Sequence, residues 1–270
     1  MNLLKRELAP FTPEAWTAID DEGRRILALH LAARKIVDFK GPFGWTHGAV
    51  NTGRLAPVGP PPFEGVTSRQ RVVLPLIEVR AAFRLPIADL DDISRGATDV
   101  ELKPLLDAVA HLAAAEDGAV FNGWAAAGIR GILETAEHAP VTYRDARSLP
   151  AAVVEAKEIL RRAGVDGPYA LVLGPRIYDQ VFSSAEDGFP IRDRIAPLVD
   201  QIVWAPALEE GALVSKRGGD YELTVGQDLS IGYASHDAET VELYLTETFT
   251  FRVLETTAAV AIRSGSMPAL

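Results

Sequence analysis

Alternating apolar and polar residues mark the clearest strand in the chain. From Val241 to Val253 every second residue is apolar, except at Glu247, and the residues between them are polar. A shorter alternation of the same kind runs from Ile77 to Leu85. Side chains two apart lie on the same face of a strand, so both segments are predicted as half-buried strands. The first is long enough to indicate a wide, extended sheet.

Helical spacing is strongest near the N-terminus. Thr12 is a predicted N-cap, Pro13 fits the first helical position, and apolar residues recur every three or four positions from Trp16 to Leu27. This helix is expected to end near Lys35. Further helices are predicted from Pro104 to about Gly123 or Gly128, from Leu149 to Ala163, and over Arg176–Ser183. Short strands are expected at Ile36–Phe39, Tyr169–Leu173, Gln201–Ala205, Ala212–Ser215, Tyr221–Val225 and Ala258–Arg263. Clustered rather than alternating helices and strands predict an α+β fold.

Residues 45 to 70 follow neither pattern. They are rich in glycine and proline, include the run Pro60–Pro62, and contain few large aliphatic residues. A structureless insert of this length is usually functional or contacts another molecule, and the alternative is a flexible linker.

Composition narrows the classes of protein. The chain has 270 residues with 27 basic and 37 acidic side chains, a net charge of −10. A free nucleic-acid-binding protein usually has the opposite sign. No apolar run approaches the roughly 20 residues that cross a bilayer. The first ten residues lack the features of a secretory signal, and cysteine is absent. We therefore expect a cytoplasmic protein that binds neither membrane nor nucleic acid.

Catalytic motifs are not found in the sequence. It has no dinucleotide, phosphate-loop, serine-elbow or zinc-protease motif, and its five histidines are scattered. The adjacent carboxylates Glu116-Asp117 and Glu186-Asp187 do not imply an acid–base pair, because neighbours on a helix point in different directions. Residues 216–220 form either an anion-binding nest or a hairpin loop. The motifs therefore predict a non-enzymatic protein without a metal or cofactor site.

Four stretches carry a resemblance to a known family. They are L-L-K-R-E-L-A-P-F-T-P-E-A-W-T-A-I-D near the N-terminus, A-R-K-I-V-D-F-K-G-P-F-G-W at 33–45, L-P-L-I-E-V-R-A-A-F at 74–83, and R-G-G-D-Y-E-L-T-V-G-Q-D-L-S-I-G-Y at 217–233. With these stretches the chain resembles the encapsulin shell proteins of bacterial nanocompartments, nearly from end to end.

The resemblance implies the Hong Kong 97-type phage capsid fold, with a peripheral domain, an axial domain and an extended loop. The implied division is 1–44 for the N-terminal helix and the start of the peripheral domain, 45–72 for the extended loop, 73–131 for the peripheral domain with its spine helix, 132–222 for the axial domain, and 223–270 for the peripheral sheet and C-terminal tail. Closed icosahedral symmetry implies a shell of a multiple of about sixty copies.

The implied function is enclosure of a cargo enzyme, a dye-decolorizing peroxidase or a ferritin-like iron-storage protein. A terminal targeting peptide of the cargo is expected to dock in a groove between the N-terminal helix and the peripheral sheet. The residues expected to bind it are Leu27, Leu31, Arg34, Ile36, Asp38, Phe249 and Phe251. The alternative is that the apolar members of this set simply pack against the sheet.

A pore at the five-fold axis is also implied. Its expected lining is Ser183, Ser184, Ala185, Glu186, Asp187 and Gly188. Rings of Glu186 and Asp187 would raise the local concentration of cations. The alternative is an ordinary solvated turn.

Two other readings remain open. A phage or prophage major capsid protein would share the fold, although the chain has no basic arm and no long scaffold-like N-terminal segment. Older descriptions of the family mention protease or bacteriocin activity, but no nucleophile and base are paired in the sequence. A flavin is associated with some shells of the family, and no residue here supports predicting one. The identity of the cargo and the size of the shell are not predicted.

Overall fold

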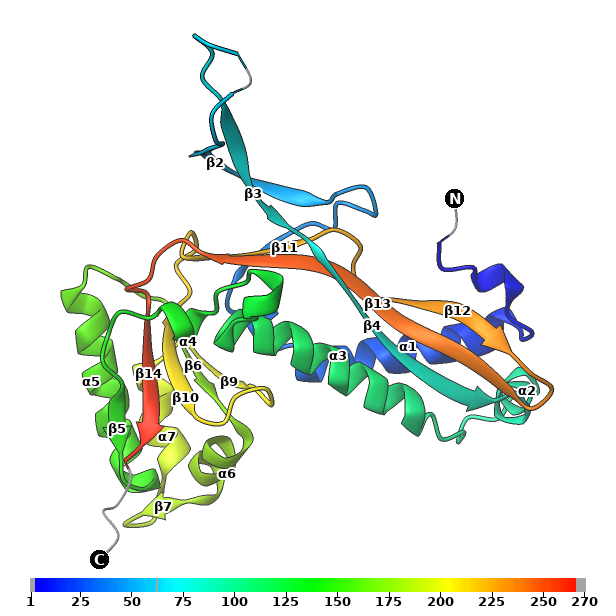
Figure 1. The fold of residues 1–270 in the computed structure, drawn as a ribbon. Coiled ribbons are helices and arrows are strands. Elements are labelled where there is room, and N and C mark those ends of the chain that lie inside the picture. The colour runs from blue at the N-terminus through cyan, green and yellow to red at the C-terminus, as the bar shows by residue number, and fades with distance from the viewer. Residues whose placement is uncertain (1–2, 62, 266–270) are drawn as a thin grey trace, which may run out of the picture.

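The computed structural model describes residues 3–61 and 63–265, which form two sheets, flanking helices and a projecting arm (Figure 1). The helices are α1 (Pro13–His30), α2 (Ile87–Ser94), α3 (Lys103–Asn122), α4 (Ile132–Thr135), α5 (Leu149–Arg162), α6 (Pro175–Ser183) and α7 (Ile191–Ile195). The strands are β1 (Asp38–Lys40), β2 (Ala49–Pro57), β3 (Arg69–Pro75), β4 (Ile77–Pro86), β5 (Val141–Tyr143), β6 (Tyr169–Leu173), β7 (Ala185–Glu186), β8 (Phe189–Pro190), β9 (Gln201–Trp204), β10 (Gly211–Ser215), β11 (Tyr221–Val225), β12 (Ser230–His236), β13 (Thr240–Val253) and β14 (Ala259–Ser264). Within these residues, no helix is both long and apolar enough to cross a bilayer.

Strand β13 is the centre of the first sheet. It pairs antiparallel with β4 along one edge, and with β12 and β11 along the other, while β1 joins β11. The predicted strands at 77–85 and 241–253 are thereby confirmed. Strand β12 was not predicted, because Gly232 and a bulge between Tyr233 and Ser235 break its alternation. A Cβ at Gly232 would lie 2.4 Å from the Tyr244 ring, so the glycine is required by that contact.

Helices α1 and α3 run side by side against the first sheet (Figure 1). As predicted, Thr12 caps α1 and Pro13 opens it. The prediction that α1 continues to Lys35 was wrong, because the helix ends at His30. The Asp117 carboxylate of α3 accepts the backbone N–H groups of Ala32 and Ala33 at 2.8 and 2.9 Å, so neither amide continues the helix. The strand predicted at 36–39 accordingly begins later, as β1.

The second sheet has the strand order β5-β14-β10-β6-β9. Every residue of its central strands β6 and β10 is buried. Helix α5 packs against β5, β10 and β14, and α6 packs against β6. The sequence-based division placed residues 223–270 with the first sheet, whereas the structure pairs β14 with β10 and β5 in the second. The difference arises because the alternation around 258–263 does not specify which sheet receives the strand.

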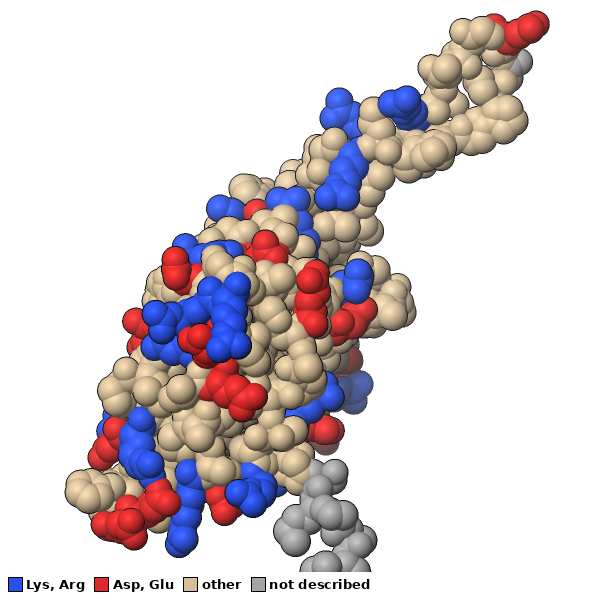
Figure 2. Space-filling model, turned by 90° about the vertical axis from the view of Figure 1, so that its left-hand side faces the viewer, with Lys and Arg blue, Asp and Glu red and all other residues tan. Residues whose placement is uncertain are grey.

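The glycine- and proline-rich region forms an arm rather than a structureless insert. Strands β2 and β3 pair antiparallel and project away from both sheets (Figure 1). The arm is almost free of charge along its outer part (Figure 2). Its charged residues are Arg54, Glu64, Arg69 and Arg71. Large apolar side chains are exposed on it, namely Leu55, Val58, Phe63, Val66 and Val73. Exposed apolar surface of this kind is typical of a protein-binding segment.

Two short connections join the sheets and are bonded to each other. Residues 216–220 lead from β10 to β11, and residues 254–258 lead from β13 to β14. The backbone N–H groups of Leu254 and Glu255 both donate to the Asp220 carbonyl, at 2.8 and 3.2 Å. The buried Asp220 carboxylate also pairs with Arg217 at 2.9 Å. The junction is therefore held by a shared hydrogen-bond network.

Candidate functional site

A groove lies between α1 and strands β12 and β13, where the sequence analysis expected a binding site. We call it the α1–β12 groove; its volume is about 190 Å³. Its apolar lining is Leu4, Leu27, Leu229, Ile231 and Leu245. Its polar lining includes Arg6, Asp20, Arg24 and Ser230. An apolar surface edged by charges of both signs suits a short peptide with apolar anchors.

Gly23 faces Ile231 across this groove. It is buried on α1, and a Cβ there would lie 3.5 Å from Ile231 Cδ1. A larger side chain at position 23 would therefore fill the groove. Glycine makes a helix less stable than alanine does. At position 23 the missing side chain leaves open space between α1 and the sheet.

The N-terminal segment closes one side of the groove. The Leu4 carbonyl accepts the Tyr233 N–H at 2.8 Å, and the Leu3 carbonyl accepts the Tyr244 hydroxyl at 3.1 Å. Arg6 forms a two-point ion pair with Asp20, at 2.7 and 3.2 Å, and lies over the Trp16 ring at 3.9 Å. These contacts place Leu4 in the groove lining.

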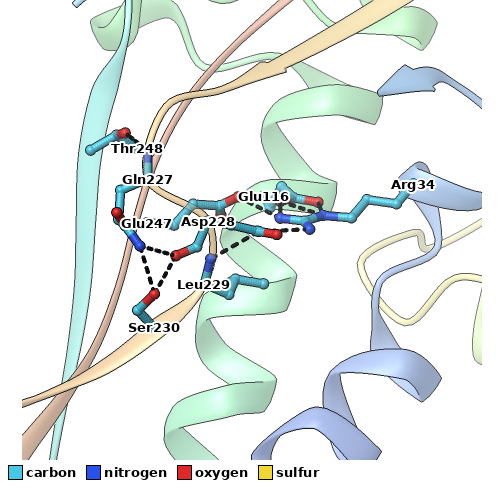
Figure 3. Close-up of polar contacts among 8 residues, drawn as sticks. All are labelled: Arg34, Glu116, Gln227, Asp228, Leu229, Ser230, Glu247 and Thr248. Carbon is cyan, nitrogen blue, oxygen red and sulfur yellow. Dashed lines mark hydrogen bonds and ion pairs between the residues drawn. The ribbon is translucent and has the colours of Figure 1, made fainter. Parts of the chain in front are cut away.

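A buried ion-pair network supports the turn that leads into β12 (Figure 3). The Arg34 guanidinium donates to Glu116 at 2.6–3.0 Å, to Glu247 at 2.5 Å and to Asp228 at 2.9 Å. Asp228 in turn accepts the Leu229 N–H at 2.9 Å. Arg34 thus holds Asp228 in place, and Asp228 in turn holds the backbone of Leu229, whose side chain lines the groove.

The pKa values of Glu247 and Arg34 are shifted in this network. Glu116 and Glu247 are both fully buried. Burial, followed by repulsion from Glu116, raises the pKa of Glu247 well above its usual range. Burial alone would lower the pKa of Arg34, but Glu116, Glu247 and Asp228 together raise it above its ordinary value. Burial also raises the pKa of the neighbouring Asp117 to about 7. The network therefore favours a charged arginine and a protonated Glu247.

The structure separates the predicted peptide-binding residues into different environments. Leu27 lines the groove. Leu31 and Ile36 are 8% and 5% exposed, and Phe249 and Phe251 pack inside the main core at 0% and 2%. The two phenylalanines therefore do not reach the groove. Of the residues that line it, sequence analysis missed Leu229, Ile231 and Leu245, because their partnership with α1 depends on contacts distant in sequence.

Two predicted polar contacts are already engaged within the chain. Arg34 binds the three carboxylates of its network, and its side chain is 17% exposed. Asp38 accepts the Gly219 N–H at 2.6 Å. Gly218 and Gly219 both have positive φ, so the 216–220 loop forms a turn whose backbone faces the Asp38 carboxylate. The one sequence signal for the Arg34 network was Glu247, the only acid on the apolar face of β13.

The predicted pore residues form the end of α6 and a tight hairpin. Ser183 ends α6, Ala185 and Glu186 form β7, and Asp187 and Gly188 form the turn with φ of 49° and 82°. Two successive positive φ values are typical of the two-residue hairpin turn. Glu186 forms an ion pair with Arg194, whereas Asp187 lies at the tip. The two acids thus differ in whether their charge is already balanced.

The projecting arm, the long central strand and the two sheets are the architecture of the Hong Kong 97-type capsid fold. A crystal structure of a virus-like particle from Pyrococcus furiosus matches with a TM-score of 0.64 at 15% identity, covering 94% of this chain and all of that one. A solved structure from Mycobacterium phage Bobi matches with a TM-score of 0.56 at 16% identity, covering 88% of this chain and 91% of that one. At these identities the likeness concerns the fold, and it confirms the predicted α+β capsid fold.

The sequence relatives identify the family. The family model described as encapsulating protein for peroxidase matches residues 1–250. The chain is 47% identical to the type 1 encapsulin shell protein of Rhodospirillum rubrum, over all of this chain and 99% of that protein. It is 41% identical to the one from Mycobacterium tuberculosis, over 97% and 99%. The chain belongs to the type 1 encapsulin shell-protein family. Its relatives are structural shell proteins, which confirms the expectation of a non-enzymatic role.

Proposed function

We propose that this chain assembles with copies of itself into a closed icosahedral shell of a multiple of about sixty subunits. The shell would lie in the bacterial cytoplasm and enclose a cargo enzyme. Membership of the encapsulin family and the capsid fold support self-assembly. The family description favours a peroxidase as cargo. A ferritin-like iron-storage protein is the second candidate. Relatives at 40–47% identity are encapsulin shells, which favours this role over that of a phage capsid.

We propose that the targeting peptide of the cargo docks in the α1–β12 groove. Its five apolar side chains offer pockets for apolar anchors of a targeting peptide, and Arg24 and Asp20 provide charged contacts at the rim. We assign Leu27 as a direct contact. Arg34 then acts as a positioning residue that holds Leu229 through Asp228. Leu31, Ile36, Asp38, Phe249 and Phe251 lie outside the lining of the groove, so we do not assign them to the peptide.

Replacing Leu27 with aspartate tests this docking site. A charge in an apolar pocket should reduce peptide binding by at least about tenfold, because an unpaired buried charge is costly. The measurement is the amount of a fluorescent protein, fused to the cargo's terminal peptide, that co-purifies with shells on co-expression. Shells of the variant should keep their size.

Leu29→Asp provides the matched control, because Leu29 lies on the same helix and is 51% exposed. This variant should load cargo as well as the natural sequence does. Equal loading of Leu27→Asp shells of normal size would contradict the docking site, and so would equal losses in both variants.

We propose that the β7–β8 hairpin lines a pore. We assign Ser183 to Gly188 to the five-fold opening, with Asp187 as its acidic ring because Glu186 is balanced by Arg194. Asp187→Asn should slow Fe²⁺ entry several-fold, since a charged ring concentrates cations at the opening. The measurement is the rate of iron oxidation by a ferritin-like enzyme enclosed in the shell. Glu186→Gln should have a smaller effect, and an unchanged rate for Asp187→Asn would exclude the ring.

A further inference from the structure

A second cavity, remote from the groove, lies in the half of the molecule built on the second sheet. It has a volume of about 430 Å³ and is bounded by the end of β5, the residues that follow it, and α6. We call it the β5–α6 cavity. Ser184 and Ala185, which lead into the β7–β8 hairpin, line the same space.

Positive charge dominates the lining of the β5–α6 cavity. Arg144, Arg147 and Arg176 line it together with a single acid, Asp145. Asp145 already accepts the Ser148 N–H at 3.0 Å, and Arg176 already donates to the Glu210 carboxylate at 3.2 Å. Within residues 3–61 and 63–265, the guanidinium groups of Arg144 and Arg147 form no ion pair. Two unpaired arginines at one cavity are suited to an oxyanion, because guanidinium groups bind phosphate and carboxylate in a forked geometry.

Two buried polar groups of the lining also lack a partner. Tyr143 is 3% exposed, and its hydroxyl forms no hydrogen bond with any described residue. The Gln180 amide oxygen is likewise buried and without a partner. Burial raises the pKa of Tyr143, so the hydroxyl remains a donor at neutral pH. Buried polar groups are nearly always satisfied in proteins, so both groups indicate a missing ligand or water.

We propose that the β5–α6 cavity binds a phosphate group, either free orthophosphate or the phosphate of a nucleotide. The arginines would bind the phosphate oxygens, and the Tyr143 hydroxyl would add a neutral donor. The Gln180 amide oxygen would accept a hydrogen bond from a protonated phosphate oxygen or a sugar hydroxyl. The volume exceeds that of one small ion and lies within the range of small-molecule sites. This inference does not rest on the proposed cargo function, since the cavity belongs to one subunit and lies away from the groove.

The test uses purified, assembled protein in equilibrium dialysis against radiolabelled orthophosphate, with ATP in a parallel arm. Ionic strength is held constant with chloride in both arms. We expect saturable binding that approaches one phosphate group per subunit. Tighter binding of ATP would identify a nucleotide as the source of the phosphate, and binding of orthophosphate alone would identify the free ion. Absence of saturable binding in both arms would overturn the proposal.

Charge-matched variants separate this site from general attraction to basic residues. Arg144→Gln with Arg147→Gln should weaken binding at least about tenfold, because each removes a charge-assisted hydrogen bond. Arg161→Gln and Arg162→Gln together alter the same charge on α5, outside the cavity, and should leave binding unchanged. If the double cavity variant does not assemble, Arg147→Gln alone replaces it with a smaller expected loss. Equal losses in the cavity and control variants would overturn the site.

Discussion

At the scale of single residues, the Arg34 network places one cation and three carboxyl groups beside the proposed docking groove. Two of those carboxylates, Glu116 and Glu247, are fully buried. Removing the cation with Arg34→Met would leave the buried Glu116 carboxylate without its compensating charge, a change that typically costs about 3–5 kcal/mol. Glu247→Gln instead resembles the protonated glutamate and should cost far less. Arg34 therefore matters first for the shape of the groove wall.

The pH dependence of stability follows from the raised pKa of Glu247. Folding keeps a proton on Glu247 that the unfolded chain releases above its usual value of 4.5. The folded state then binds more protons, so the unfolding free energy falls as pH rises, by up to about 1.4 kcal/mol per pH unit, until the folded pKa is passed. Glu247→Gln removes this contribution. The melting temperature of the natural protein should therefore fall relative to that of the Glu247→Gln variant as pH rises from 5 to 8.

Asp117 contributes with the same sign, between its usual value of 3.8 and its folded pKa of about 7, but it is present in both proteins and cancels in the comparison. Thermal melts of natural protein, Glu247→Gln and Arg34→Met at matched pH provide the measurement. A difference between the natural protein and Glu247→Gln that stays constant across this range would show that Glu247 is ionised in the folded state.

At the scale of elements, the arm projects away from both sheets, and we propose that it contacts neighbouring copies of the chain. The arm exposes five large apolar side chains, and the outer edges of its two strands are unpaired in the described chain. Replacing residues 54–70 with a short turn should leave the two sheets folded and abolish closed shells. The check is size-exclusion chromatography with light scattering, together with circular dichroism. Normal shells from the shortened protein would show that the arm is dispensable for assembly.

Elements whose signals are local could be predicted, and those defined by distant contacts could not. The start of α1, strand β13 and the buried strand β6 follow from capping, alternation and apolar runs. The end of α1 depends on Asp117, which is far away in sequence, and β12 depends on the Tyr244 ring above Gly232. Leu27 was assigned to the groove through the family resemblance, whereas Leu229 and Ile231 on the opposite wall were not assigned, because their contact with α1 is distant in sequence.

At the scale of the whole molecule, closed symmetry makes a prediction about mass. Sixty copies of 29.1 kDa amount to about 1.7 MDa, and larger shells contain multiples of this value. The protein expressed alone should give a single species of at least that mass by light scattering. A stable monomer or small oligomer would show that closure requires cargo. The charge of −10 per subunit should make assembly more favourable as salt screens repulsion between copies.

The junction at Asp220 has a consequence for how a wall built from such subunits bears load. Because two N–H groups of the 254–258 connection donate to the Asp220 carbonyl of the 216–220 connection, we expect the two halves of the subunit to resist bending relative to each other. Differences in wall curvature would then be absorbed at contacts between subunits, above all by the slender arm. Under indentation, the subunits of such a shell should stay rigid while the arms that join them deform. The shell should therefore break at the contacts between subunits before the subunits themselves deform.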